Sequence, residues 1–216
     1  MPETLLLSEY RKGHFPMAET REDEDVFWLD PPWRGILPLE NFHIPKRLAR
    51  TMRNSNFKVS VDRAFSTVIY SCAESSRGRD KTWINAIIER SYVNLFEFRH
   101  AHSVEVWSED ELVGGLYGVS IGGAFFGESM FSRRTDASKM ALVHLVARLK
   151  AGGYALLDTQ FITEHLTQFG AEEIPRVAYK RLLAAAVNRT ANFYELGGTG
   201  DVLAVGAVLQ LTTQTS

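Results

Sequence analysis

The chain has 216 residues, of which 45% are hydrophobic and 23% charged, and its formal net charge is -2. These values are typical of a globular protein that is long enough to bury a substantial core. The only cysteine, Cys72, excludes an internal disulfide and favours a reducing compartment, so we expect a cytoplasmic protein. Residues 1–10 lack the pattern of a signal peptide, and no run of about 18 apolar residues occurs, which argues against a membrane protein.

The first part of the chain changes character near residue 43. Residues 1–42 are rich in proline and tryptophan, which suits a small irregular lobe better than a layered core. Residues 43–81 are basic and form a candidate surface for phosphate groups. Within them, residues 45–53 predict a short amphipathic helix with Leu48 and Met52 facing inward, and an ordinary solvated basic face is the alternative. The basic residues of this segment are Lys46, Arg47, Arg50, Arg53, Lys58, Arg63, Arg77, Arg79 and Lys81.

In the middle of the chain, segments with the helical spacing of apolar residues are followed by segments with the alternating pattern of strands. Helical spacing of apolar residues predicts helices at residues 65–73 and 84–99. Glycines recur inside the predicted strands, where they mark bulges or close approaches, and some of them are expected to line a site. Alternation predicts strands at residues 57–61, 103–107, 112–120 and 123–130, of which the second and third form a hairpin through residues 108–111.

A long helix then begins at Thr135-Asp136, a plausible N-cap, and ends at Gly152-Gly153. Its apolar residues nearly encircle it, so it is expected to be buried. A strand at residues 154–158 follows, and two further helices are predicted at residues 164–170 and 174–187. The order strand, helix, strand brings three polar side chains to neighbouring strand ends of one sheet, which predicts an active site there. They are Glu128, Asp158 and Gln160.

This order of elements predicts an α+β fold that resembles the N-acetyltransferase (GNAT) fold, a mixed sheet flanked by helices. We divide the chain into a small N-terminal lobe (residues 1–55), a GNAT-like catalytic domain (56–187) and a C-terminal tail without an assigned role (188–216). A coenzyme-A enzyme of this fold needs a glycine-bearing loop before its long helix to hold the pyrophosphate. The loop here, residues 132–138, has no glycine and carries Asp136, so we expect a different acyl donor and no cofactor.

Several stretches, taken in order, resemble the leucyl/phenylalanyl-tRNA–protein transferases. They are LLLSEYRKGHFP (5–16), TWI (82–84), HAHSVEVW (100–107), ELVGGLYG (111–118), GESMFSR (127–133), DASK (136–139), LDTQ (157–160) and GAEEIPR (170–176). The resemblance implies transfer of leucine, phenylalanine or also methionine from aminoacyl-tRNA to proteins that begin with arginine or lysine, which marks them for N-degron degradation. It implies no metal, and we expect a monomer.

The resemblance also implies roles for individual residues. An aminoacyl ester is already activated, so the enzyme must align the reactants, deprotonate the amine and stabilise the oxyanion. Asp158 corresponds to the orienting or proton-drawing carboxylate and Gln160 to the polar contact at the reacting centre. Their i, i+2 spacing on a strand points both side chains the same way, although a plain capping motif is the alternative. The prediction fails if both groups are sealed in the interior.

The resemblance assigns recognition of the acceptor protein and of the aminoacyl-tRNA to other residues. Glu128 corresponds to a carboxylate that attracts the basic acceptor, with a structural pair to Arg133 or Arg134 as the alternative. Leu116, Phe125, Gly127 and Met130 match the apolar pocket for the donor side chain, with core packing as the alternative. Trp83 corresponds to the residue that stacks on the terminal adenosine of tRNA, and the basic helix residues Lys46, Arg47, Arg50 and Arg53 are candidates for tRNA backbone contacts.

The chain departs from the family pattern at the adenosine end. Met17 stands where a second tryptophan is usual, and Trp28 or Trp33 is a candidate substitute. The histidines at 100, 102, 144 and 165 lack partners at metal-ligand spacing, so a structural role is predicted for them. Three alternatives stay open: a coenzyme-A-dependent N-acyltransferase of the same fold, a non-catalytic adaptor that binds tRNA or N-degrons, and a family variant with switched acceptor preference.

Overall fold

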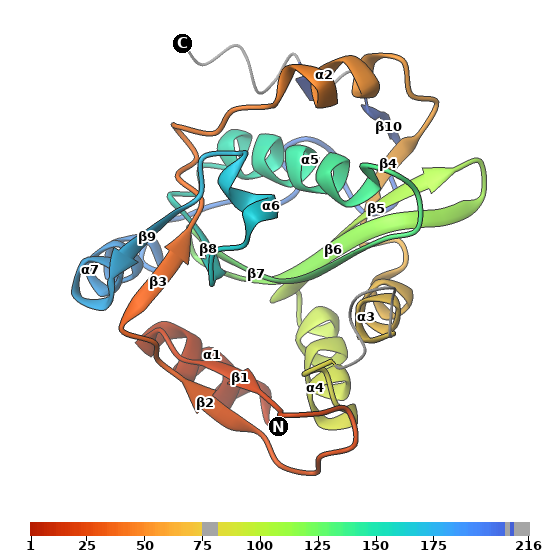
Figure 1. Cartoon of the computed structure of the whole chain (residues 1–216). Coiled ribbons are helices and arrows are strands. Elements are labelled where there is room, and N and C mark those ends of the chain that lie inside the picture. The colour runs from red at the N-terminus through yellow and green to blue at the C-terminus, as the bar shows by residue number, and fades with distance from the viewer. Residues whose placement is uncertain (75–81, 206–207, 210–216) are drawn as a thin grey trace.

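The computed structural model describes residues 1–74, 82–205 and 208–209. Their centre is one curled, mixed sheet of eight strands in the order β10-β4-β5-β6-β7-β8-β3-β9 (Figure 1). The strands of this sheet are β3 (Trp33–Ile36), β4 (Lys58–Val61), β5 (Ala101–Ser108), β6 (Glu111–Ile121), β7 (Ala124–Ser132), β8 (Leu156–Gln160), β9 (Glu172–Pro175) and β10 (Leu203–Ala204). All neighbouring pairs are antiparallel except β7 and β8, which run parallel because helix α5 crosses over between them.

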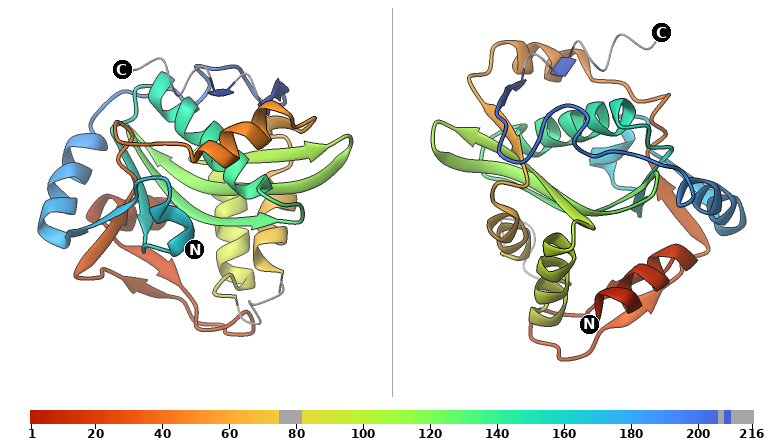
Figure 2. Two further views of the ribbon diagram at one scale, coloured as in Figure 1. Left: turned by 45° about the horizontal axis from the view of Figure 1, so that its top comes forward. Right: turned by 180° about the vertical axis from the view of Figure 1, so that it is seen from behind.

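Helices cover both faces of the sheet, as the two opposite views in Figures 1 and 2 make plain. Helices α5 and α2 lie over one face, and α1, α3 and α4 lie beneath the other (Figure 1). Each face therefore has its own buried apolar cluster. The helices are α1 (Glu3–Lys12), α2 (Lys46–Arg53), α3 (Phe65–Ala73), α4 (Ala86–Glu97), α5 (Ala137–Ala151), α6 (Glu164–Thr167) and α7 (Arg176–Ala186).

Most of the predicted elements are present close to their expected bounds. The α+β class, the β5–β6 hairpin and the burial of α5 on nearly all sides are confirmed. The amphipathic helix α2 is confirmed too, with Leu48 and Met52 almost fully buried. The N-cap of α5 differs from expectation, since the Asp136 side chain makes no cap hydrogen bond. Its carboxylate instead accepts hydrogen bonds from Arg47 and Lys139.

The expectation of an irregular first segment is wrong. Residues 1–42 contain helix α1, the two-stranded ribbon of β1 (Phe15–Met17) and β2 (Phe27–Leu29), and strand β3. Strand β3 lies between β8 and β9 in the main sheet, with Ile36 opposite Asp158 and Gly35 opposite Gln160. The division at residue 55 stays a prediction, yet the first segment supplies a strand that contacts the candidate site directly.

The described residues after 188, for which the sequence indicates no role, also join the core. Phe193 is buried and stacks on Phe125. Tyr194 donates a hydrogen bond of 2.6 Å from its hydroxyl to Asp62, and β10 pairs with β4 at the sheet edge. This segment therefore closes the α5 side of the sheet. Its sequence lacks a long periodic pattern, so its packing could not be predicted from local signals.

Gly118 shows why the strands of this sheet contain glycine residues. A Cβ atom at Gly118 would lie 2.3 Å from the carbonyl oxygen of Phe126 and 2.4 Å from the ring of Phe125. Only glycine permits this close approach. Directly beside it, the β6–β7 register shifts, so that Tyr117 pairs with Ser129 and Gly118 with Gly127. Glu128 is consequently the extra residue of a β-bulge, a feature that re-aims a side chain out of the regular alternation.

Candidate active site

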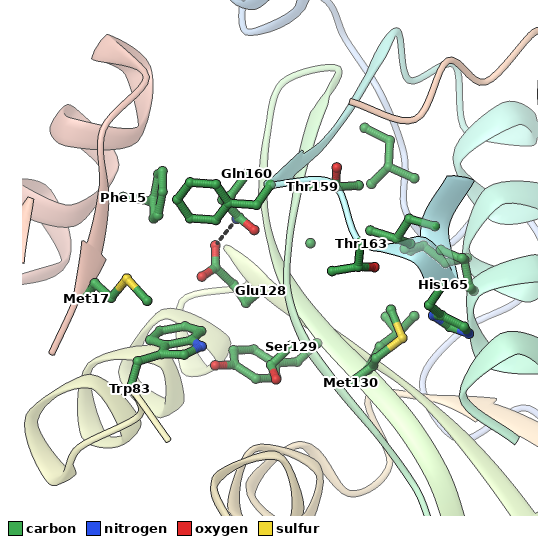
Figure 3. A pocket seen from close by; sticks show the side chains of 18 of the residues that line it. Phe15, Met17, Trp83, Glu128, Ser129, Met130, Thr159, Gln160, Thr163 and His165 are labelled. Atoms are coloured by element: carbon green, nitrogen blue, oxygen red, sulfur yellow. Dashed lines mark hydrogen bonds between the residues drawn. The ribbon is translucent and has the colours of Figure 1, made fainter. Parts of the chain in front are cut away.

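A cavity of about 310 Å³ opens beside the bulge at Glu128. In Figure 3, Trp83, Met17 and Phe15 lie at one end, Glu128 and Gln160 lie in the middle, and Met130, Thr163 and His165 lie at the other end. Helix α5 adds apolar side chains to the wall. The remaining lining residues are Pro16, Leu116, Tyr117, Gly127, Ser129, Leu142, Leu145, Leu157, Thr159, Phe161 and Leu166.

Glu128 is held by side chains from three other elements. The hydroxyl of Tyr10 on α1 donates to its Oε1 at 2.6 Å, and the hydroxyl of Tyr92 on α4 donates to its Oε2 at 2.9 Å. The Gln160 amide Nε2 donates to Oε1 at 3.2 Å. The Tyr10 and Tyr92 hydroxyls also contact each other. Neither Arg133 nor Arg134 is among its contacts, since these residues pair with Glu74 and Glu111 respectively, so the structural-pair alternative is wrong.

Burial raises the pKa of Glu128 to about 7. The hydrogen bonds from Tyr10 and Tyr92 oppose this shift, while the nearby Asp158 carboxylate adds to it and the Arg34 guanidinium reduces it. Burial and the Glu128 carboxylate raise the pKa of both tyrosines well above the usual value, so their hydroxyls stay neutral donors. A carboxyl group whose pKa lies near neutrality is suited to exchange a proton at physiological pH.

Asp158 is placed quite differently, although it lies only two residues before Gln160. It is fully buried and does not line the cavity. The Arg34 guanidinium binds it in a bidentate manner, with Nε 2.9 Å from Oδ1 and Nη2 2.7 Å from Oδ2. The Tyr179 hydroxyl donates to Oδ2 at 2.6 Å, and the Gln160 backbone N–H donates to Oδ1 at 2.8 Å. Asp158 is therefore a buried, ion-paired carboxylate behind the cavity wall.

Arg34 itself is 1% exposed and is fixed on every side. Its guanidinium lies over the rings of Phe15 and Tyr179, at 4.4 Å and 4.6 Å from the ring centroids. Its Nη1 donates to the carbonyl oxygen of Gly13, the residue that ends helix α1. Burial lowers the pKa of Arg34, but the Asp158 carboxylate more than offsets this and the net direction is upward. The pair thus ties α1, β3, β8 and α7 together.

Gln160 reaches the cavity because its backbone departs from the strand conformation. Its φ is 56°, in the left-handed region that residues other than glycine rarely adopt. The expectation that Asp158 and Gln160 point the same way assumes extended backbone, and this residue breaks it. Only Gln160 faces the cavity, whereas Asp158 is sealed. The condition that would exclude an active site, burial of both groups, is not met.

The residues predicted for the donor side chain fall into two groups. The cavity is lined by Leu116, Gly127 and Met130. The Leu116 side chain is only 3% exposed, so it also forms part of the hydrophobic core. Phe125 does not line it. This residue is fully buried and packs against Phe193 and Tyr154.

The adenosine end contains Trp83 and Met17, both of which line the cavity. The proposed substitutes for the second tryptophan do not. Trp28 packs partly buried in the cluster beneath the sheet, and Trp33 is 54% exposed at the start of β3. Neither borders the cavity, so the chain presents one tryptophan and one methionine at this end.

The basic helix α2 lies over α5 on the opposite face of the sheet from α1 and α4 (Figure 2). Lys46, Arg47, Arg50 and Arg53 are exposed on it. Arg47 is paired at 3.2 Å with Asp136, the residue before α5. The further basic residues Arg77, Arg79 and Lys81 lie outside the described residues.

The histidines lie in separate places. His102 bonds to Asp62 through Nδ1 at 2.7 Å and stacks on Phe193, which fits a structural role. His144 is buried in α5, where burial lowers its pKa to about 3. His165 lines the cavity, so the structural prediction for it stays untested. Residues 1–74, 82–205 and 208–209 contain no group of three or more His, Cys, Asp and Glu side chains placed to hold a metal ion.

Four residues of the site have no predicted role from sequence: Tyr10, Arg34, Tyr92 and Tyr179. Tyr10 lies in the LLLSEYRKGHFP stretch, and the motif alone says nothing about its partner. Arg34 is more than 120 residues before Asp158, and local periodicity carries no information on such a contact. An arginine in the middle of a short strand, with apolar neighbours, is the one signal that could have pointed to a buried ion pair.

The arrangement suits the transfer of an acyl group to an amine. Apolar walls can hold a side chain, an aromatic ring can hold a base, and a carboxyl group with an amide lies between them. No helix in the described ranges is both long and apolar enough to cross a bilayer. The cavity therefore fits a transferase that joins two substrates in one pocket.

Comparisons with known proteins identify the family. Residues 36–184 match the family described as leucyl/phenylalanyl-tRNA protein transferase. A leucyl/phenylalanyl-tRNA–protein transferase of Caulobacter vibrioides is 62% identical over 197 residues, covering 90% of this chain and 91% of that protein. The one from Phenylobacterium zucineum is 58% identical over 214 residues, with 98% and 96% covered. The chain belongs to the leucyl/phenylalanyl-tRNA protein transferase family.

The structure of L-PGS from Bacillus licheniformis superposes with a TM-score of 0.45 at 14% identity, covering 87% of this chain and 77% of that one. This likeness is too low to support an argument about the site. The family assignment rests on the sequence matches alone.

Proposed function

We propose that the protein transfers leucine or phenylalanine, and also methionine, from aminoacyl-tRNA to the N-terminal arginine or lysine of acceptor proteins, which marks them for N-degron degradation. The observation that carries this proposal is one cavity in which an aromatic end, a carboxyl–amide centre and an apolar end follow one another. This order matches the adenosine, ester and side chain of an aminoacyl-tRNA terminus. The family membership of the chain supports the same reaction.

The donor occupies the cavity from end to end. The terminal adenine stacks on Trp83, with Met17 on the same side of the cavity, since an aromatic face holds any base without regard to sequence. The aminoacyl side chain lies among Gly127, Met130 and Leu116, with Leu142 of α5 behind them. A flexible methionine in this wall accommodates both branched and flat side chains.

The acceptor meets the ester at the centre of the cavity. The Glu128 carboxylate attracts the basic residue at the N-terminus of the acceptor. Gln160 contacts the reacting groups through its side-chain amide, and Asp158 orients Gln160 through a hydrogen bond to its backbone N–H. No covalent intermediate on the enzyme is needed, because the ester supplies the driving force.

The body of the tRNA contacts the exposed basic residues of α2 through its phosphates. Within the described part of the chain, Lys46, Arg50 and Arg53 form no ion pair, whereas Arg47 is partly neutralised by Asp136. The contacts are independent of sequence, as expected of backbone phosphates. We further propose that the enzyme acts as a monomer in the cytoplasm, where charged tRNA is present.

We also propose a GNAT-like architecture, supported by the crossover of α5 between the parallel strands β7 and β8. Coenzyme A is not favoured as donor. The N-terminus of α5 is preceded by the Asp136 carboxylate, whose Oδ1 accepts from Arg47 at 3.2 Å and from Lys139 at 2.7 Å. A pyrophosphate at this helix end would meet a like charge.

One assay tests the proposal. The protein is incubated with radiolabelled leucyl-, phenylalanyl- and methionyl-tRNA and with peptides that begin with Arg, Lys, Asp or Ala, and labelled peptide is counted. Label on the Arg and Lys peptides is the expected result, and label on the Asp peptide alone would identify a variant with switched acceptor preference. Absence of label with every pair, together with thermal stabilisation by acetyl-coenzyme A, would overturn the tRNA-donor proposal.

A further inference from the structure

We propose that Glu128 is the proton acceptor of the transfer reaction and that Asp158 is a positioning residue that holds Gln160 in place. This inference rests on the proposed function, since it concerns the same reaction. We assign a different role to each carboxylate from its access to the cavity and from the hydrogen-bond partners that it already has. Asp158 is sealed and saturated, whereas Glu128 lines the cavity and has room for one hydrogen.

Asp158 has no position for another proton. A carboxylate offers about four acceptor sites, two on each oxygen. Its Oδ1 accepts from the Arg34 Nε and from the Gln160 backbone N–H, and its Oδ2 accepts from the Arg34 Nη2 and from the Tyr179 hydroxyl. All four sites are therefore filled by groups of the protein itself. The side chain is also 0% exposed, so an acceptor amine cannot contact it.

Asp158 instead acts through the backbone of Gln160. A non-glycine residue with φ at 56° is held in a conformation of higher energy, and it persists only where neighbouring contacts fix it. The hydrogen bond of 2.8 Å from the Gln160 N–H to the Asp158 Oδ1 is such a contact. In this conformation the Gln160 amide donates to Glu128. Asp158 thus determines where Gln160 points without touching the substrates.

Glu128 has a vacant position for a proton. Its carboxyl group and the hydroxyls of Tyr10 and Tyr92 form a triangle with an oxygen–oxygen contact along each side. Three such contacts require three hydrogens, but the two hydroxyls supply only two. A proton taken up by Glu128 would complete the ring. The protonated and ionised carboxyl groups are thus both accommodated, which is what a group that takes and returns a proton needs.

The electrostatic surroundings agree with this geometry. The groups that face Glu128 are Tyr10 from α1, Tyr92 from α4, Arg34 from β3, and Asp158 and Gln160 from β8. Burial raises the pKa of Glu128 to about 7, so both forms are populated near neutral pH. The tyrosines keep their protons because their own pKa values are raised well above the usual range.

The proposed step balances as follows. The nitrogen of the neutral α-amine attacks the ester carbonyl carbon, a C–N bond forms, and the carbonyl oxygen takes the electron pair. One N–H proton passes to the Glu128 carboxylate. The tetrahedral adduct then collapses, the bond from carbon to the ribose O3′ breaks, and O3′ leaves with the electron pair. Glu128 returns the proton to O3′, so the products are an amide and a free 3′-hydroxyl, and the enzyme is restored.

The first test compares Glu128→Gln with the wild type in single-turnover transfer from phenylalanyl-tRNA to an arginine-terminated peptide. Loss of general base catalysis typically lowers the rate about 10²- to 10⁴-fold, and we expect this loss at saturating acceptor, in addition to the rise in acceptor KM that follows from the lost attraction. Glu111→Gln is the matched control, because Glu111 is an exposed carboxylate at the start of β6 that pairs with Arg134 on the protein surface. It should leave the rate unchanged.

The second test follows the single-turnover rate from about pH 5 to about pH 9 with an aminooxy-terminated acceptor, whose nucleophile is a weak base and stays neutral, so that only the enzyme titrates. The wild-type rate should rise through a midpoint near neutrality. Tyr92→Phe removes a donor to the carboxylate, and we expect it to shift the midpoint upward. Asp158→Asn should lower the rate and keep the pH-dependent rise, with its midpoint shifted downward because a charge that raises the pKa of Glu128 is lost.

Two results would overturn the role of Glu128, and a third would contradict the proposed function instead. If Glu128→Gln raises the acceptor KM for arginine and lysine peptides and keeps the maximal rate, Glu128 serves recognition alone and the inference is overturned. It is equally overturned if Asp158→Asn abolishes the pH-dependent rise and Glu128→Gln retains it. A wild-type protein that labels no peptide at any pH contradicts the proposed function itself, which is a separate outcome.

Discussion

The candidate site contains two carboxyl clusters that share one strand pair and differ in almost every physical respect. Around Asp158, a guanidinium, a tyrosine hydroxyl and a backbone N–H fill every acceptor site, and no part of the carboxylate is exposed. Around Glu128, two hydroxyls and an amide leave one position open, and the group lines the cavity. The first cluster is built to be rigid, and the second is built to change its charge.

The difference follows from the partner that each carboxylate has. An arginine is always charged, and its bidentate pair with Asp158 fixes that side chain in place. Tyrosine hydroxyls are neutral and can donate or accept, so Glu128 is not held in one ionisation state. The contrast teaches that the two acidic residues of a strand-end motif need not share the chemistry. Their burial and their partners decide which one stabilises the fold and which one reacts.

The largest expected effect is on stability and comes from Asp158→Ala. This change leaves Arg34 charged, buried and without its carboxylate partner, which typically costs about 3–5 kcal/mol in the free energy of unfolding. Urea denaturation measures it. The double variant Arg34→Met with Asp158→Leu removes both charges and should recover most of the loss. If Asp158→Ala unfolds at the wild-type urea concentration, the cluster is not the rigid anchor described above.

The next effect is a pH dependence of stability with an unusual sign for a carboxyl group. The pKa of Glu128 is about 7 in the folded protein and 4.5 as the ordinary value. Between these values the folded state binds more protons than the unfolded state, so the unfolding free energy falls as pH rises through this window. Glu128→Gln removes this loss. We expect its stability relative to wild type to increase by about 1–3 kcal/mol from about pH 4.5 to about pH 8.

Urea denaturation at both pH values checks the Glu128 prediction. Glu111→Gln again serves as the control, and the stability difference between this variant and the wild type should not change with pH in the same way. A flat difference between Glu128→Gln and wild type would mean that Glu128 is ionised throughout, which would remove the contrast between the two clusters.

A third prediction concerns the open end of the cavity and should leave both clusters unaffected. Met17→Trp places a second aromatic face on the cavity at the end where Trp83 lies. Base stacking contributes about 1–3 kcal/mol, so the Kd for donor tRNA should fall about fivefold or more, with stability near that of the wild type. Trp83→Ala should weaken binding instead. Nitrocellulose-filter binding of charged tRNA measures both, and unchanged affinity in both variants would contradict the adenosine assignment.

The smallest effect is expected at α2, on the face of the sheet that α5 covers (Figure 1). Arg50→Ala removes one charge from α2 and should reduce the slope of log K for tRNA against log salt by about 0.7–0.9 if it contacts one phosphate. Arg50 does not line the cavity, so the rate at saturating tRNA should be unchanged. Arg181→Ala, an exposed arginine on α7, is the matched control. Equal slopes for the two variants would remove α2 from the proposed tRNA surface.

Much of this molecule could be predicted by reading along the chain. The bounds of α3 were predicted residue for residue, and those of α2, the β5–β6 hairpin and α5 nearly so, because their apolar periodicity and flanking breakers are local signals. The gathering of Glu128, Asp158 and Gln160 follows from the order strand, helix, strand. Strand β3 and the C-terminal segment were missed, since short strands and single aromatic anchors carry little periodicity.

What sequence alone determined is the family, the α+β class and the residues that gather at one end of β7 and β8. It determined these because motifs, periodicity and chain order are all contained in local spacing. Only the tertiary structure decided which carboxylate is sealed and which lines the cavity. The difference depends on side chains from distant parts of the sequence, namely Arg34, Tyr179, Tyr10 and Tyr92. It also depends on the β-bulge at Glu128 and on the left-handed backbone of Gln160, neither of which a local sequence pattern predicts.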